Sequence, residues 1–280
     1  MRLVAFYDTV ACMIADGRAV AKALEVELRE KLSGLPPRKA CFILFGENAD
    51  SEQFITMKST VAERLGIGVD VLRYPETVST EEAVAIVQAA SEKGYSGIVV
   101  QLPLPPGLDR EKILNSVPAE LDIDVLGEEA KRRYTEGDPS KIPPVARAVA
   151  EILKFYDVSL ADKRVLVLGK GKLVGEPVSA MLSLARIPFT IVDQRTGEGE
   201  KAALISSADV IVSGMGVPHF LRPEMVKEGV VLIDAGTSEQ AGKLVGDIDP
   251  ACAAKAALLT PVPGGVGPVT VACLFLNLAV

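Results

Sequence analysis

Short apolar stretches alternate with amphipathic helical stretches along nearly the whole chain, which is the pattern of an α/β fold. In the first half, strands are predicted at residues 40–45, 69–72 and 97–101, and helices at 50–65 and 80–93. These strands are continuously apolar, which is typical of parallel strands covered by helices on both faces. The first half therefore predicts a parallel sheet.

A second series of the same kind begins near Lys163. A polar, proline-bearing stretch at 136–144 separates the two series, and a helix predicted at about 145–156 would link two domains. The last apolar segment, after Pro268, is predicted as a helix with proline at its first position. The elements predicted in the second series are strands at 164–168, 189–192, 209–213 and 230–234 and a helix at 174–184.

Length and composition fit two globular domains or one large one, because the chain has 280 residues, of which 49% are apolar and 24% charged. Its net charge of −7 argues against a nucleic-acid or anionic-membrane partner. The start of the chain lacks the pattern of a signal peptide, and the longest apolar run, 269–280, falls short of the ~20 residues that span a bilayer. We therefore expect a cytoplasmic protein, and four cysteines without a CxxC pair agree with a reducing compartment.

His219 is the only histidine, and no metal-ligand spacing is present. We therefore expect no metal site and no Ser-His-Asp triad. Any chemistry must rest on lysine, carboxylates, amides or a cofactor.

A glycine-rich loop follows the first strand of the second series, with Gly169, Gly171 and Gly175 spaced as G-x-G-x-x-x-G before a helix. A phosphate must approach backbone N–H groups at a helix N-terminus, and glycine lacks the Cβ that would block it. The spacing is one residue longer than G-x-G-x-x-G, and a plain glycine turn is the competing interpretation. The strand-like segments that follow favour a dinucleotide site.

Asp193 ends the next strand, where an acidic residue often binds the adenosine ribose and disfavours a 2′-phosphate. Arg195 and Lys170 argue the other way, because either could pair with that phosphate. A solvated strand-end carboxylate is the competing interpretation of Asp193. These residues leave NAD and NADP both open.

A lysine lies beside an aromatic ring on the helix predicted at 50–65. Asp50 as N-cap and Gln53 resemble a capping box, and Phe54 and Lys58, spaced i, i+4, share one face. Such a pair suits a flat heteroaromatic ligand with a reacting nitrogen, although it is also a common surface arrangement. Gln101 ends a strand, where ligands of open α/β sheets collect.

Two further segments combine unusual residues. Asp122 and Asp124 stand in an apolar stretch, either as a helix cap or as a pair buried in a cleft. Residues 260–270 contain three glycines and three prolines, which form either a stiff loop close to a ligand or an irregular linker.

Together these strings resemble the bifunctional methylenetetrahydrofolate dehydrogenase/cyclohydrolase family, from Asp16 almost to the C-terminus. The resemblance implies oxidation of 5,10-methylenetetrahydrofolate with NADP or NAD, and hydrolysis of the methenyl product to 10-formyltetrahydrofolate. It is carried by Ser51-x-x-Phe54-x-x-x-Lys58, Val100 to Pro105, Asp122-Ile123-Asp124 and Pro261 to Pro268, with weaker support from 169–177 and 242–249.

The resemblance also implies an architecture. A folate-binding catalytic domain would comprise 1–144 plus 267–280, and a Rossmann-like NAD(P)-binding domain would comprise 145–266, with the C-terminal helix returning to the first. It further implies a cleft between the domains, a homodimer, tetrahydrofolate derivatives as partners, and a place in one-carbon metabolism and purine biosynthesis.

By the same resemblance, Lys58 is the general acid/base of the cyclohydrolase step, Gln101 tunes it, and Asp124 binds the pterin. Burial should lower the pKa of this lysine from ~10.4, so that it is partly neutral near pH 7. The implied substrate-binding residues are Ser51, Phe54, Val100, Leu102, Pro263, Gly264, Gly265 and Val266. The implied cofactor-binding residues are Gly169, Lys170, Gly171, Val174, Gly175, Asp193, Arg195 and Thr237.

The chain departs from the family at several of these positions. Phe54 stands where the family has tyrosine, Lys170-Gly171 replaces arginine-serine, and the segment at 192–194 replaces cysteine-histidine-serine. Two alternatives follow: a dehydrogenase with weak or lost cyclohydrolase, and a non-catalytic nucleotide-binding regulatory protein. The presence of Lys58, Gln101 and Asp124 argues against the second.

Overall fold

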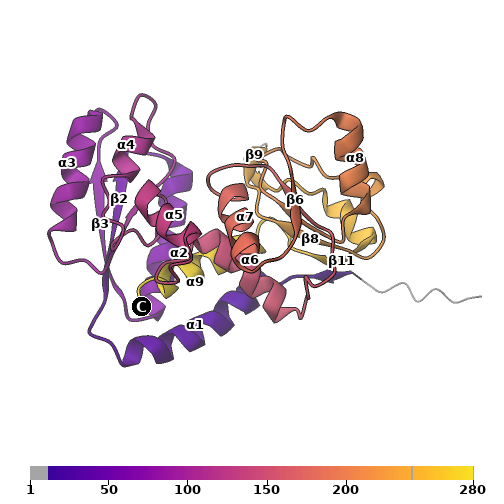
Figure 1. Cartoon of the computed structure of the whole chain (residues 1–280). Helices are drawn as coiled ribbons and strands as arrows, with labels where there is room; N and C mark the ends of the chain where they lie inside the picture. The colour runs from indigo at the N-terminus through magenta and orange to yellow at the C-terminus, as the bar shows by residue number, and fades with distance from the viewer. Residues whose placement is uncertain (1–11, 241, 280) are drawn as a thin grey trace, which may run out of the picture. The chain divides into compact units, whose positions relative to one another are not determined.

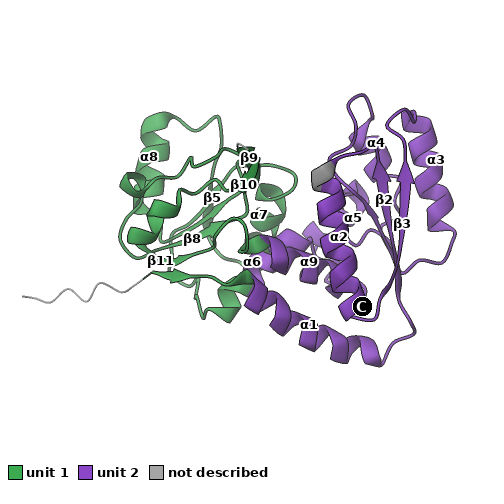
Figure 2. Ribbon diagram, turned by 180° about the vertical axis from the view of Figure 1, so that it is seen from behind, with its two compact units in different colours: residues 1–17, 152–266 green, residues 18–151, 267–280 purple. Residues whose placement is uncertain are grey.

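The computed structural model describes residues 12–240 and 242–279, apart from the side chains of residues 49 and 50. The chain forms two compact units (Figure 2). Unit 1 contains the described residues 12–17 together with 152–266, and unit 2 contains 18–151 together with the described residues from 267 onward. The expected boundary at 144/145 lies at the start of helix α6 (Pro144–Phe155), and the assignment of folate and cofactor to separate domains stays a prediction.

Unit 2 is built on a parallel sheet with the strand order β3-β2-β4. Its central strand is fully apolar and buried from Ala40 to Phe45, as expected for a strand covered on both faces. The strands lie between α2 and α3 (Figure 1), and residues 121–122 extend the sheet beside β4 through an Ile98–Asp122 bridge. The elements are β2 (Lys39–Phe45), α2 (Ala49–Arg64), β3 (Gly68–Tyr74), α3 (Thr80–Ser91) and β4 (Gly97–Val100).

Further helices of this part of the chain were not predicted from the sequence pattern. They are α1 (Gly17–Ser33), α4 (Arg110–Leu114) and α5 (Glu128–Thr135).

The C-terminal helix α9 (Val266–Leu276) packs in unit 2, which confirms that the chain end returns to the first sheet. The rings of Phe275 and Phe42 lie 6.4 Å apart. Asn277, 1% exposed, donates to the carbonyls of Ile123 (2.8 Å) and Ile142 (2.9 Å). Because α9 begins at Val266, Pro268 is its third residue and not, as predicted, its first; its missing N–H is tolerated anywhere in the first turn.

Unit 1 contains a parallel sheet with the order β1-β11-β8-β7-β5-β6 in its described residues. Helices α7 and α8 lie on opposite sides of the strands (Figure 1). Strand β5 has β6 on one side and β7 on the other, so the order in which strands are added to the sheet reverses at β5. This is the topological switch point at which open α/β sheets bind ligands. The parallel, two-unit α/β fold expected from the sequence is therefore confirmed.

The four predicted strands of unit 1 correspond to β5, β6, β7 and β8 to within one residue at each end. The elements of this unit are β1 (Met13–Ile14), β5 (Val165–Leu168), α7 (Gly175–Leu184), β6 (Phe189–Val192), α8 (Glu198–Ser207), β7 (Val210–Ser213), β8 (Val230–Asp234) and β11 (Ala256–Leu259), with the antiparallel pair β9 (Ser238–Gln240) and β10 (Lys243–Val245) and two 3₁₀ turns, Pro223–Met225 and Pro250–Ala254. The short strands β1, β9, β10 and β11 were not predicted. Within residues 12–240 and 242–279, no helix is long and apolar enough to span a membrane.

Candidate functional site

Three of the predicted site residues meet in unit 2. The Lys58 Nζ donates a hydrogen bond of 3.0 Å to the Gln101 Oε1 and lies 4.0 Å from the Asp124 Oδ2. The same Nζ is 5.9 Å from the centre of the Phe42 ring, which forms the apolar floor beneath it. Lys58 lies on α2, Gln101 directly follows β4, and Asp124 lies two residues after Asp122, which pairs with β4.

The side chain of Lys58 is largely buried because of its place on α2. The residues of α2 that pack inward are Ser51, Ile55, Val61 and Ala62, and Lys58 lies seven positions after Ser51 on the same face. The helix begins at Ala49, and its N-cap is Asn48, whose side chain accepts from the Ser51 N–H, so the predicted capping box starting at Asp50 is wrong. Asn48 satisfies one of the free N–H groups of the first turn instead.

Burial lowers the pKa of Lys58, and the nearby Asp124 carboxylate partly offsets this by raising it. The lysine side chain is 12% exposed and that of Asp124 is 24% exposed. Within the described part of the chain, the groups that stabilise the charge of the lysine are the neutral Gln101 amide, the Asp124 carboxylate at 4.0 Å and the face of the Phe42 ring. The predicted direction of the pKa change is therefore confirmed, and a neutral amine is accessible nearer to physiological pH than in water.

Gln101 is fixed by the backbone around it. It follows directly after β4, its backbone N–H donates to the Ile43 carbonyl (2.9 Å), and its side-chain Nε2 donates to the Leu102 carbonyl (2.6 Å). This second bond orients the amide so that its oxygen faces Lys58. The buried Ser51 hydroxyl also donates to the Leu102 carbonyl (3.4 Å), which joins α2 to the segment after β4.

Asp122 holds the segment that carries Asp124. Its carboxylate, 3% exposed, accepts from the N–H groups of Val125 (2.8 Å), Leu126 (2.9 Å) and Gly127 (2.8 Å). Burial raises the pKa of Asp122 to about 6 despite these bonds. The sequence identifies this carboxylate as one of a pair but does not reveal its role. The N–H groups of three successive residues reach the Asp122 carboxylate only because the chain folds back toward it.

Val125, the residue after Asp124, has a φ of 55° and is buried. A β-branched residue in this left-handed conformation costs about 1–3 kcal/mol and persists only where its surroundings impose it. The Asp122 carboxylate imposes it by accepting from the Val125 N–H. Strain is therefore concentrated next to Asp124, as is common at functional sites.

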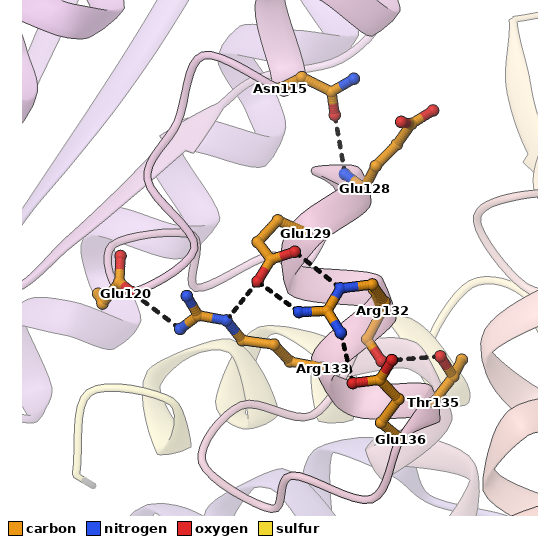
Figure 3. A network of polar contacts seen from close by, with 8 residues as sticks. All are labelled: Asn115, Glu120, Glu128, Glu129, Arg132, Arg133, Thr135 and Glu136. Carbon is orange, nitrogen blue, oxygen red and sulfur yellow. Dashed lines mark hydrogen bonds and ion pairs between the residues drawn. The ribbon is translucent and has the colours of Figure 1, made fainter.

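The next helix, α5, is anchored to the same segment by a surface network of charged residues (Figure 3). Arg133 bridges Glu120 (2.8 Å) and Glu129 (2.9 Å), and the Asn115 side chain accepts from the Glu128 N–H (2.8 Å). Arg132 adds contacts to Glu129. These exposed pairs contribute little individually, but as a network they fix the start of α5 relative to the strand-like segment that leads to Asp122.

A second cluster of predicted residues lies at the carboxyl ends of the strands in unit 1. The loop from Gly169 to Val174 connects β5 to α7, whose N-terminus follows directly. A Cβ on Gly175 would lie 2.1 Å from the Gly169 carbonyl oxygen, and Gly169 itself has a φ of 91°. Glycine is therefore required at both positions, and no side chain that the structure describes caps the N-terminus of α7, where a phosphate could bind backbone N–H groups.

The remaining predicted cofactor residues follow neighbouring strands. Asp193 follows β6, and its carboxylate accepts from the Arg195 N–H (2.8 Å) in a turn. The Arg195 and Lys170 side chains are exposed, as is Thr237, three residues after β8. The parallel register brings the ends of β5, β6, β7 and β8 to one edge of the sheet. His219, in the loop after β7, donates its backbone N–H to the Gly246 carbonyl (3.0 Å).

The proline- and glycine-rich loop before α9 packs on the start of the described chain. The Gly17 N–H donates to the Gly264 carbonyl (3.0 Å), and a Cβ on Gly17 would lie 1.8 Å from the Gly265 oxygen. The Gly265 N–H closes the turn onto the Pro261 carbonyl (2.8 Å). Of the predicted substrate residues here, Pro263 is exposed and Gly265 and Val266 are buried, and all of them belong to unit 1.

A groove of about 530 Å³ lies along α1, α2 and α9 of unit 2 and includes none of the predicted site residues. Its charged lining consists of Arg18, Lys22, Glu25, Arg29 and Arg64. The Arg64 guanidinium is paired with the Glu25 carboxylate (2.5 Å and 2.9 Å).

Comparison with known families gives two adjacent matches. Residues 15–124 match the model of the tetrahydrofolate dehydrogenase/cyclohydrolase catalytic domain, and residues 143–280 match that of the NAD(P)-binding domain of the same enzymes. This chain belongs to the tetrahydrofolate dehydrogenase/cyclohydrolase family. Among its relatives is the bifunctional protein FolD of Methanoculleus marisnigri, which is 39% identical over 95% of this chain and 94% of the relative.

Solved structures of this family share the fold. The bifunctional FolD enzyme of Campylobacter jejuni superposes with a TM-score of 0.90 at 31% identity, covering 96% of this chain and 98% of that one. The FolD of Trypanosoma brucei, which was solved with NADP and an inhibitor, gives a TM-score of 0.87 at 35% identity, covering 95% of this chain and 96% of that one. The family resemblance inferred from the motifs is therefore confirmed, and with it an NAD(P)-binding domain in the second half.

Proposed function

We propose that this family member catalyses both reactions, the oxidation of 5,10-methylenetetrahydrofolate with NADP or NAD and the hydrolysis of the methenyl product to 10-formyltetrahydrofolate. The observation that carries the proposal is the largely buried Lys58 with Gln101 at 3.0 Å and Asp124 at 4.0 Å. A nucleotide-binding protein without catalytic activity has no need of a lysine whose pKa is lowered by burial.

Lys58 handles the proton of the hydrolysis. As a neutral amine it accepts a proton from the water that attacks the methenyl carbon. The bond from that carbon to one folate nitrogen then breaks, the nitrogen takes the proton from the lysine, and the remaining hydroxyl proton passes to solvent as the formyl C=O forms. The Gln101 carbonyl oxygen accepts from the Nζ and holds it in place, while its own amide is fixed by the Leu102 carbonyl. Asp124 binds the amino edge of the pterin, and its charge keeps the pKa of the lysine from falling further.

Further residues position the folate in this proposal. Phe54 is placed four residues before Lys58 on α2 and stacks on the ring system, as an aromatic side chain does with a flat ligand. The other residues proposed to contact the folate are Ser51, Val100, Leu102, Pro263, Gly264, Gly265 and Val266.

The loop residues of unit 1 fit a dinucleotide. No side chain of the described residues caps the start of α7, and Gly175 approaches Gly169 closely, an arrangement that suits a pyrophosphate at the helix N-terminus. When bound, NADP or NAD accepts the hydride from the one-carbon bridge. The residues proposed to hold it are Gly169, Lys170, Gly171, Val174, Gly175, Asp193, Arg195 and Thr237.

The decisive experiment uses Lys58→Met. We expect this variant to lose hydrolysis of added methenyltetrahydrofolate and to keep much of the reduction of nicotinamide cofactor, both followed by absorbance. Lys31→Met, at an exposed lysine paired with Glu27, is the matched control and should keep both activities. Equal loss of both activities with intact folate binding would refute the division of labour, and a wild type active only in reduction would establish the dehydrogenase alternative.

We also propose that the enzyme is a cytoplasmic homodimer without a nucleic-acid or membrane partner, and that it supplies one-carbon units for purine biosynthesis. The net charge of −7 supports the absence of a nucleic-acid or membrane partner, and the four free cysteines at 12, 41, 252 and 273 support a reducing cytoplasm. The family resemblance supports the homodimer and the place in purine biosynthesis. Light scattering in solution should give twice the chain mass of 29.6 kDa; a single chain mass would contradict the dimer.

A further inference from the structure

Two buried carboxylates in unit 1 take no part in the chemistry described above. Asp234, the last residue of β8, is 2% exposed, and Asp247, in the loop after β10, is 0% exposed. Among the described residues no cationic side chain forms an ion pair with either. Burying a carboxylate without a cation is costly unless hydrogen bonds replace water, and burial raises the pKa of Asp234 to about 7.

Asp247 holds the loop that follows β7. Its carboxylate accepts from the Ser213 hydroxyl (2.8 Å), the Met215 N–H (2.7 Å) and the Val217 N–H (2.8 Å). Three donors in five consecutive residues therefore converge on one side chain, which fixes the path of the chain from 213 to 217.

Asp234 holds the loop that follows its own strand and the position of Asp247. Its carboxylate accepts from the N–H groups of Gly236 (3.0 Å), Asp247 (3.2 Å) and Ile248 (2.9 Å). Its own backbone N–H donates to the Thr260 hydroxyl (2.7 Å). The two carboxylates thus form a relay of hydrogen bonds from the end of β8 to the loop after β7.

The backbone is moulded closely around both carboxylates. A Cβ on Gly236 would lie 2.2 Å from the Asp247 carboxyl carbon, and one on Gly246 would lie 2.1 Å from the Asp234 Oδ2. Both contacts are far inside van der Waals distance, so these glycines let the chain approach the carboxylates directly. The arrangement admits no larger side chain.

The held loop packs against the glycine-rich loop. A Cβ on Gly169 would lie 2.9 Å from the Gly214 oxygen, and one on Gly214 would lie 2.3 Å from the Val174 side chain. The Gly214 N–H continues the sheet pairing onto the Leu168 carbonyl (2.9 Å). The segment fixed by Asp247 therefore lies against the glycine-rich loop at the switch point between β5 and β7, where open α/β sheets bind ligands.

We propose that Asp234 and Asp247 are positioning residues for the dinucleotide site. Asp247 fixes the loop after β7 against the glycine-rich loop, and Asp234 fixes the start of the loop after β8 and the position of Asp247. This inference rests on the proposed use of a dinucleotide at the strand ends of unit 1. Neither residue touches the reacting atoms; each acts through the loop backbone, with Met215 and Val217 on one side and Gly236 and Thr237 on the other.

The carboxylate is essential to this role. An asparagine offers one acceptor oxygen, and its NH₂ group would face N–H or O–H donors that need an acceptor. Asp→Asn at either position therefore leaves buried donors without partners and loosens the loop, although the volume of the side chain hardly changes.

The test compares Asp247→Asn and Asp234→Asn with Ser213→Ala, which removes one donor to Asp247, and with Asp249→Asn. Asp249 is an N-cap whose side chain accepts from the Ala251 N–H, a role that asparagine fills equally well, so it is the matched control. For each variant, KM for NADP and for NAD, dehydrogenase kcat, hydrolysis of added methenyltetrahydrofolate and the thermal midpoint are measured.

We expect the two Asp→Asn variants to lose roughly 10- to 100-fold in dehydrogenase kcat/KM, chiefly through KM for the cofactor, because a misplacement of about 1 Å can cost on the order of 10²-fold. Ser213→Ala should shift KM in the same direction by less, and hydrolysis should stay near wild type in all variants. If Asp247→Asn folds and its KM for the cofactor is unchanged, the inference is overturned. If Asp247→Asn does not fold, an unchanged KM for the cofactor in Ser213→Ala overturns it instead. Equal loss of both activities would also overturn it by assigning the pair a purely structural role. A wild type that reduces neither NADP nor NAD would instead refute the proposed function.

Discussion

Gly175, the first residue of α7, offers the sharpest test of how the glycine-rich loop works. A methyl group added by Gly175→Ala would lie 2.1 Å from the Gly169 oxygen, 2.8 Å from the Gly169 carbonyl carbon and 2.9 Å from the Lys170 Cα. All three are backbone atoms, so no side-chain rotation can relieve the overlap. Restoring an ordinary contact requires a displacement on the order of 1 Å of the loop relative to the helix.

A displacement of this size moves the N–H groups proposed to bind the pyrophosphate. Misplacement by about 1 Å typically costs on the order of 10²-fold in rate, so we expect dehydrogenase kcat/KM for the cofactor to fall by about that factor. Hydrolysis of added methenyltetrahydrofolate should remain near wild type, because Lys58, Gln101 and Asp124 lie in the other unit. The assay is the absorbance of reduced nicotinamide, with methenyl decay as the internal reference.

Two alanine variants serve as controls. Gly199 lies in α8, and a methyl group added there would have nothing within 4 Å, so Gly199→Ala should change neither activity. At Gly171 the nearest atom to an added methyl group, the Gly214 oxygen, is 3.9 Å away, so any loss in Gly171→Ala reports on the approach of the ligand and not on loop packing. Wild-type dehydrogenase kcat/KM in Gly175→Ala, or an equal fall in both activities, would refute the reasoning.

Three further outcomes follow from the geometry of unit 2. Asn277→Leu removes the bonds to two buried carbonyls and one N–H, so the free energy of unfolding should fall by about 3 kcal/mol in urea titration; a loss below about 1 kcal/mol would contradict the importance of this contact. Cyclohydrolase kcat/KM should rise with pH through a pKa below 10.5, and Asp124→Asn, which removes a charge that raises this pKa, should move the profile to lower pH and not to higher pH. Phe54→Tyr restores the family's hydroxyl and should raise the cyclohydrolase-to-dehydrogenase ratio by up to about tenfold, the value of one hydrogen bond; an unchanged ratio would show that the hydroxyl is dispensable here.

Much of the architecture is readable from local pattern. The strands at 40–45 and 165–168 are continuous apolar runs, and the structure places both inside parallel sheets, with a neighbouring strand on either side. The short strands β1 and β9 were not predicted, because two or three residues are too few for a periodicity to develop. Pairing partners from distant parts of the chain, such as β11 for β1, define them.

The candidate site divides in the same way. Local sequence is enough to show that Phe54 and Lys58 share a helix face and that Gln101 and Gly169 follow strands, because these relations depend only on helical spacing and on where an apolar run ends. From the sequence, the association of Lys58 with Gln101 and Asp124 rested on the family resemblance alone, because the contacts themselves, across 43 residues in the first case, depend on the folded chain.

Other decisive contacts also depended on the folded chain. Asp234 and Asp247 were not singled out from the sequence, although Asp247 falls in a string that matches the family. Asp122 stood out as a carboxylate in an apolar stretch, but its partners did not. Their partners are mainly backbone N–H groups, which nearly every residue possesses, so composition cannot reveal them. Only the path of the chain brings three donors to each carboxylate, and this is the physical reason that the loops around the proposed sites could not be derived from the sequence alone.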